Sequence, residues 1–467
     1  MSVGRRLLVI VLVVCSAWGA GLSFAVLKGR LPEPWARRSL VPAKTAVPAG
    51  DPSCDCAPAG PSAGTPASSA GAPPAATARL ARYVVCGREE GPPALAELPG
   101  LARNATRLAV HCGSSVHVIA LTPDGALRPE RIAQLNANSP SPAEAPRAVA
   151  PIAADLDGDG RRDLLAPMLL VDAQGNPRGG ALHLLHARPE GGFDAARRAL
   201  ELAPGAVAAL RLGAPPSESL ALIQLAAAQL ARSNELWIVR GGPAPLRSET
   251  RTAVGVGATA LAVADLDRDG LDDVAVASES EGRVRLFRGG AAADAQPAVW
   301  DVPGVREALG ADLDGDGAQD LVLVGTRVWL VLASKSEPLA PRELAASDGL
   351  RELSAVDVDR DRKLDLVGYA HPQLVALLQR DQLTFERRTV ATLSGDAAVY
   401  SARMLALDAS EPENRRLIAW ITTLSTGSEP AVEIAFARDV TLGARLELAA
   451  RAQPLPDAPL VERFGLR

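Results

Sequence analysis

Four short loops rich in aspartate carry the residues best suited to chemistry in this chain. Each loop has Asp at its first, third, fifth and ninth positions. Four carboxylates within nine residues repel one another unless a cation lies among them, and oxygen ligands are what Ca²⁺ prefers. No Cys or His is expected to join the clusters, which disfavours zinc. The predicted Ca²⁺ ligands are Asp155, Asp157, Asp159, Asp163, Asp265, Asp267, Asp269, Asp273, Asp312, Asp314, Asp316, Asp320, Asp357, Asp359, Asp361 and Asp365.

The backbone of each loop is expected to contribute as well. Three loops have Gly at position 6, which permits the positive φ of a tight turn around an ion. The fourth has Arg362 there, so we predict three strong Ca²⁺ sites and a weaker fourth. The residue at position 7 would add a carbonyl ligand in each loop: Arg161, Leu271, Ala318 and Lys363.

The elements that must position these loops are strands. An EF-hand would need a Glu at position 12 and flanking helices. Instead, an aliphatic run follows each loop at once, as in residues 164–171, 274–277, 321–324 and 366–369. Such runs are typical of buried strands. Each loop is therefore predicted to join two antiparallel strands.

The loops recur at a regular spacing. Their first aspartates are residues 155, 265, 312 and 357, and the first interval of 110 equals two periods of 55. Degenerate copies are expected near residues 98, 211 and 408. Seven units of about 45–57 residues, each with room for four strands, predict an all-β chain folded as a β-propeller. Proposed fourth strands include residues 383–390 and 445–448.

At this point the residues match a known pattern. The acidic loop and strand of residues 264–277 resemble the FG-GAP or VCBS repeats of the integrin α-subunit propeller and of bacterial surface proteins. The resemblance implies that the ions are structural and that ligands engage the opposite face of the disc. It identifies no ligand-binding loop here, because no motif of this sequence matches one.

The N-terminal residues indicate export. An uncharged run from Leu7 to Leu27 is long enough to span a bilayer and follows Arg5 and Arg6. Residues 1–30 are thus a signal anchor or a cleaved signal peptide, and residues 31–77 are a Pro/Ala/Ser/Gly-rich linker. Residues 78–467 form the propeller. We expect it outside the cytoplasm, held at the cell envelope or secreted.

The cysteines fit an oxidising compartment. Cys86 and Cys112 lie in strand-like runs and could form a disulfide, although two buried thiols would fit equally well. Cys54 and Cys56 lie in the linker, where a local or intermolecular disulfide is the more natural interpretation.

Composition and motifs restrict the function. With 49 basic and 54 acidic side chains the net charge is −5, which argues against nucleic acid as a partner. The chain has no Walker loop and no HExxH motif, and we predict no catalytic residue. His183 and His186 should point to opposite faces of a strand, and His111 and His117 are expected to have ordinary packing or surface roles. The favoured function is a non-enzymatic module that binds or adheres to a protein or glycan. The alternatives are a propeller-type polysaccharide lyase or hydrolase and an architectural envelope subunit.

Overall fold

The computed structural model describes sixteen segments of the chain, all within the compact unit Leu40–Arg467. They are residues 77–87, 93–98, 106–121, 127–135, 144–189, 192–194, 196–213, 217–226, 233–242, 246–290, 295–336, 338–395, 398–406, 417–424, 431–438 and 440–454. The predicted membrane segment and all of the predicted linker except Thr77 lie outside them. Within the described segments, no helix has the length and apolarity needed to cross a bilayer.

The described residues form six β-sheets. Four of them contain four strands each, one contains five and one contains nine. The strands are β1 (Thr77–Gly87), β2 (Ala94–Leu98), β3 (Thr106–His111), β4 (Ser115–Leu121), β5 (Leu127–Gln134), β6 (Ala145–Ala148), β7 (Ile152–Ala154), β8 (Asp163–Val171), β9 (Pro177–Leu185), β10 (Arg197–Glu201), β11 (Pro204–Leu210), β12 (Ser219–Gln224), β13 (Asn234–Arg240), β14 (Arg247–Gly255), β15 (Ala258–Ala264), β16 (Asp273–Ser278), β17 (Arg283–Phe287), β18 (Ala298–Asp301), β19 (Glu307–Ala311), β20 (Asp320–Val324), β21 (Val328–Val331), β22 (Arg342–Glu343), β23 (Arg351–Val356), β24 (Asp365–Ala370), β25 (Gln373–Gln379), β26 (Phe385–Ser394), β27 (Ala398–Ala406), β28 (Leu417–Leu424), β29 (Ala431–Arg438) and β30 (Ala444–Pro454). A single turn of 3₁₀-helix, η3 (Asp381–Leu383), precedes β26.

Within four of the sheets, sequential strands pair as antiparallel neighbours and form a meander such as β11-β12-β13-β14. The second strand of the repeat is buried along its whole length in β8, β16 and β20. A strand buried on both faces reads as a continuous apolar run rather than an alternating one. This explains why the aliphatic runs after the acidic loops lack alternation.

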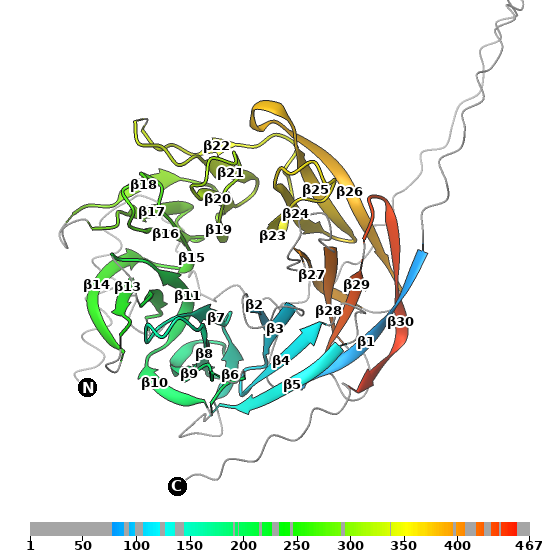
Figure 1. Cartoon of the computed structure of the whole chain (residues 1–467), viewed down its shortest axis with the longest axis horizontal. Helices are drawn as coiled ribbons and strands as arrows, with labels where there is room; N and C mark the ends of the chain where they lie inside the picture. Colours follow the sequence, from blue (N-terminus) through cyan, green and yellow to red (C-terminus); the bar gives the residue numbers. More distant parts are fainter. Residues whose placement is uncertain are drawn as a thin grey trace, which may run out of the picture. The chain divides into compact units, whose positions relative to one another are not determined.

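The sheets pack face to face around a common centre (Figure 1). The innermost strands contact one another in chain order, β2 with β7, β7 with β11, β11 with β15, and so on to β27. Apolar clusters connect neighbouring sheets: one joins Leu169 of β8 with Ile223 of β12 and Val276 of β16. This radial packing is that of a β-propeller and confirms the predicted fold class.

The nine-stranded sheet contains the seam of the ring. Its order is β23-β24-β25-β26-β30-β1-β29-β28-β27. The prediction that residues 445–448 form the fourth strand of the last unit is wrong in this respect. The N-terminal strand β1 takes that place, antiparallel to β29, and β30 lies outside it, parallel to both β1 and β26.

Two interactions hold β1 at the seam, and a third joins the first and last sheets directly. The Arg82 guanidinium lies 2.8 Å from the Glu433 carboxylate of β29, and both side chains are buried. Cys86 of β1 forms a disulfide with Cys112, which directly follows β3 of the first sheet. Apolar side chains of the last sheet, including Trp420, also pack against Leu108 of β3. The first and last sheets are therefore joined through β1.

We expect Arg82→Met to destabilise the protein by about 3–5 kcal/mol, because it leaves the Glu433 carboxylate buried without its partner. Urea unfolding followed by tryptophan fluorescence measures the change. The matched control is Arg79→Met on the same strand, whose ion pair with Glu447 is 3.7 Å long and exposed. Such surface pairs contribute little, so this variant should unfold like the wild type. Equal midpoints for Arg82→Met and the wild type would contradict the proposed closure.

Candidate metal centres

All four acidic loops occupy the same place in their sheets. Each joins an inner strand, β7, β15, β19 or β23, to the strand that follows it in the chain. The residue before each loop pairs with its ninth position: Ala154 with Asp163, Ala264 with Asp273, Ala311 with Asp320, and Val356 with Asp365. This confirms that the loops join antiparallel strands, and it places all four on one face of the propeller.

The first aspartate of each loop organises the turn by accepting backbone hydrogen bonds. In the first loop, Asp155 accepts from the N–H of Gly158 and from that of Gly160, both at 2.9 Å. In the fourth loop, Asp357 accepts from the N–H of Arg362, also at 2.9 Å. The loop backbone therefore wraps around the position-1 carboxylate.

The carboxylates at positions 1, 3 and 5 converge in every loop. In each triplet, one oxygen per side chain lies within 4.8 Å of the other two. The triplets are Asp155, Asp157 and Asp159; Asp265, Asp267 and Asp269; Asp312, Asp314 and Asp316; and Asp357, Asp359 and Asp361. Among the described residues, Oδ1 of Asp267 and Oδ1 of Asp359 are buried and have no hydrogen-bond partner. Oxygens buried without partners are costly unless a cation satisfies them.

The aspartate at position 9 is buried in all four loops. Asp320 accepts backbone hydrogen bonds from Leu313 and Ala333, both at 2.9 Å, and so fastens the loop to the end of β21. Burial raises the pKa of Asp163, Asp273 and Asp320, and raises that of Asp365 to about 6. Of the four position-9 aspartates, only Asp163 lies close enough to other potential ligands of the described residues to form a metal-binding group with them. Asp273, Asp320 and Asp365 stay predicted ligands.

The turns use two left-handed residues where the sequence predicted one. Position 6 has φ between 72° and 91°, with Arg362 adopting the same conformation as the three glycines. Position 4 is left-handed too, at Gly158, Arg268, Gly315 and Arg360. The glycines at position 4 of two loops, Gly158 and Gly315, were the sequence signal for this second left-handed residue. The carbonyls at position 7 stay predicted ligands, and the N–H of each position-7 residue donates to the position-5 carboxylate.

Arginine side chains from outside a loop, or from a neighbouring loop, reach three of the loops. Arg288 contacts Asp267 at 3.2 Å and Asp273 at 2.7 Å. Arg380 contacts Asp359 at 2.7 Å. Arg268 extends from the second loop to Asp316 of the third. Sequence reasoning missed these partners, although Arg288 and Arg380 each directly follow the third strand of a sheet.

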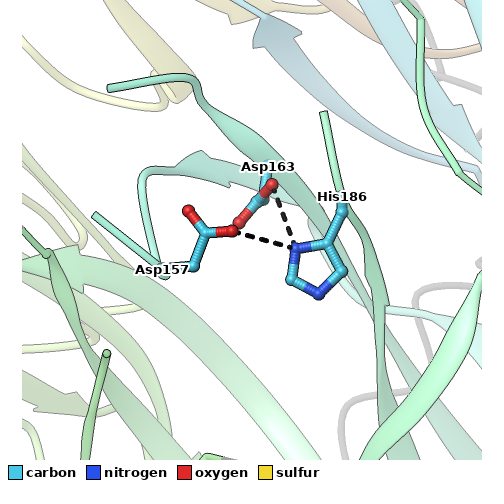
Figure 2. A group of neighbouring side chains, drawn as sticks. All are labelled: Asp157, Asp163 and His186. Carbon is cyan, nitrogen blue, oxygen red and sulfur yellow. Dashed lines mark ion pairs between the residues drawn. The ribbon is translucent and has the colours of Figure 1, made fainter. Parts of the chain in front are cut away.

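The first loop has a histidine instead. His186 Nδ1 lies 3.6 Å from Asp157 and 3.5 Å from Asp163 (Figure 2). The prediction that no His joins these clusters is wrong here. His186 follows β9, whose last residues pair with the first residues of β8, so the antiparallel register returns it to the loop.

The other strand histidines lie away from the loops. His111 is buried and its ring nitrogens contact the carbonyls of Val149 and Gly113. Burial lowers the pKa of His111, and it lowers that of His117 on β4 to about 4. His111 is buried and His117 is partly buried, in keeping with the ordinary packing or surface roles predicted for them.

The chain is similar to one repeat family and to several solved structures. Residues 265–323 match the model of the FG-GAP-like repeat. No curated protein matches the chain. Similar structures include BBS1N in complex with ARL6DN, with 9% identity over 78% of this chain and 100% of that one and a TM-score of 0.43. A lectin of Agrocybe aegerita that recognises N-acetylglucosamine is 13% identical over 69% of this chain and 88% of that one, with a TM-score of 0.42. The Dos1 propeller is 11% identical over 79% of this chain and 97% of that one, with a TM-score of 0.41.

We expect Gly317→Ala to destabilise the protein by about 1–2 kcal/mol, because position 6 holds φ at 89° and a Cβ is unfavourable there. No heavy atom lies within 4 Å of the added Cβ, so the cost is conformational. Gly179→Ala is the control, since its site is equally open and its φ is not left-handed. Thermal unfolding in EGTA measures both. Equal losses in the two variants would contradict the conformational origin of the cost.

The depressed pKa of His117 predicts a loss of stability in acid. Unfolded histidine binds a proton near pH 6.5, whereas folded His117 does so only near pH 4. The unfolded state thus binds more protons between these values, so stability falls as the pH drops from about 6.5 to 4. His117→Gln should lose less stability over this interval than the wild type in urea unfolding. Identical pH slopes would refute this assignment.

Proposed function

We propose, from the premise that this chain is a β-propeller carrying an FG-GAP-like repeat, that it is a Ca²⁺-binding module that binds or adheres to a partner without catalysis. The observation that carries the proposal is the convergence of three carboxylates in each of four equivalent loops. The partner is a protein or a glycan. It engages the face of the disc opposite the acidic loops.

The donor set fits Ca²⁺ in loops two to four. Each loop supplies oxygens from three side chains, with room for a backbone carbonyl and water, and Ca²⁺ takes six to eight oxygen ligands. The buried unpartnered oxygens of Asp267 and Asp359 support the same conclusion. In these loops Arg288, Arg268 and Arg380 contact the carboxylates and would turn outward when the ion enters.

The bound ions would act on the scaffold. The loops connect inner strands on one face, and mutual repulsion of their carboxylates favours opening of the turn. A cation at each loop would remove that repulsion and hold the first strand against the second. The opposite face would then be a rigid platform, which suits binding because little conformational entropy is lost on association.

The proposal includes the blade number and the location. Counting β23–β26 as one blade and β27–β29 with β1 as another gives seven blades in all. The uncharged run from Leu7 to Leu27 supports export, either as an anchor or as a cleaved signal peptide. The propeller would then act at the cell envelope or after secretion.

Ca²⁺ should raise the melting temperature of the full chain, and EGTA should lower it, because the ions bind only the native state. At about 100 times its Kd, each site adds about 2.7 kcal/mol. The double variant Asp312→Asn with Asp314→Asn should bind one ion fewer by equilibrium dialysis. The control is Asp301→Asn, which removes an exposed carboxylate outside the loops.

Glycan and protein arrays probed with the full chain then test the binding role. Ligand binding that weakens in EGTA supports the proposal. A melting curve that is the same in Ca²⁺ and in EGTA would refute the metal assignment. Turnover of a polysaccharide by the purified chain would refute the non-enzymatic role.

A further inference from the structure

The first acidic loop differs from the others at one structurally equivalent position. In each sheet that carries an acidic loop, a backbone N–H donates a hydrogen bond to Oδ1 of the position-9 aspartate. The donor lies at the end of, or just beyond, β9, β17, β21 or β25. The donors are Ala187, Gly289, Ala333 and Gln379. The residues that precede them are His186, Arg288, Leu332 and Leu378. Only the first loop therefore has a side chain at this position that can ligate a metal.

The position-9 aspartate of the first loop also has a different environment. In the other three loops its Oδ2 accepts a hydrogen bond from the backbone N–H of position 2, at 3.2 Å for Asp273, 2.9 Å for Asp320 and 2.8 Å for Asp365. Asp163 is 1% exposed, and among the described residues its Oδ2 has no hydrogen-bond partner. A buried oxygen left in this state points to a ligand that satisfies it.

His186 also has a buried polar atom that lacks a hydrogen-bond partner among the described residues. Its Nδ1 is buried, faces the two carboxylates and makes no hydrogen bond to any described residue (Figure 2). The distances from Nδ1 to Oδ1 of Asp163 and to Oδ2 of Asp157, 3.5 and 3.6 Å, are too long for hydrogen bonds. Two ligands on a tetrahedral ion with bonds of about 2.1 Å lie about 3.4 Å apart. The observed spacing is therefore that of ligands around a small metal ion.

We propose that Asp157, Asp163 and His186 form a mixed carboxylate–imidazole site that selects a divalent first-row transition ion over Ca²⁺. This inference deepens the proposed function, since it reassigns one of the four metal loops. Imidazole nitrogen is a poor ligand for Ca²⁺ and a good one for Zn²⁺, Co²⁺ and related ions. Arg161 pairs with Asp159 on the outer side of the loop, which leaves the three ligands to the metal.

The test uses Co²⁺ with the full chain, because its visible d–d absorption reports nitrogen and oxygen ligation directly. We expect the wild type to bind one Co²⁺ more tightly than any further equivalent. His186→Ala should weaken this tight site by about tenfold or more and change Ca²⁺ affinity little. The matched control is Arg288→Ala at the equivalent position of the second loop, which should leave the tight Co²⁺ site intact. The imidazole is partly exposed, and circular dichroism checks that both variants fold.

Equal Co²⁺ affinity and an unchanged absorption spectrum in His186→Ala would overturn this inference. The outcome is separable from that of the proposed function. If Ca²⁺ fails to stabilise the chain while one Co²⁺ is held through His186, the proposed Ca²⁺ role fails and this site stands. If Ca²⁺ stabilises the chain and Co²⁺ binds all loops alike, the Ca²⁺ role stands and this site fails.

Discussion

The second strand of the repeat is buried on both faces in β8, β16 and β20, so each of these sheets needs a neighbour on either side, and the ring has to close. Closure must bring together the first and last sheets, whose strands lie far apart in the sequence. Here the N-terminal strand β1 completes the last sheet, while its disulfide from Cys86 to Cys112 connects it to the first. The buried pair of Arg82 and Glu433 fixes β1 beside β29, because neither charge is tolerable there alone.

The closed ring is what allows the acidic loops to exist. A turn with two left-handed residues and four carboxylates is unfavourable in isolation, both in backbone conformation and in electrostatic energy. The flanking strands are buried and paired in fixed register, and the position-9 aspartates of loops two to four accept two backbone hydrogen bonds each. The scaffold thus supplies the stability that the loops lack, and it confines the charge to one face.

Sequence reasoning recovered the features that are local and repeated. The loops, the strands beside them and the period all follow from patterns within about 50 residues, because hydrogen bonding within a meander joins chain neighbours. It missed features that depend on distant residues. Arg82 and Glu433 are 351 residues apart, and β1 precedes the first repeat, so no periodic signal links it to β29. His186 was missed for a smaller reason: it lies 23 residues after Asp163, and only the register of β8 and β9 shows that the two meet.

The four loops share a backbone conformation and differ in the nitrogen-bearing side chain nearest to their carboxylates, and this difference has a chemical consequence. A guanidinium is permanently charged, so in loops two to four an incoming ion would have to displace Arg288, Arg268 or Arg380 from the carboxylates that each contacts. A neutral imidazole carries no such charge and has a lone pair directed at the same space. On the proposal above, His186 would add a ligand where Arg288, at the equivalent position of the second loop, would compete with the ion. One difference at an equivalent position would then give repeated loops different metal preferences without any change in fold.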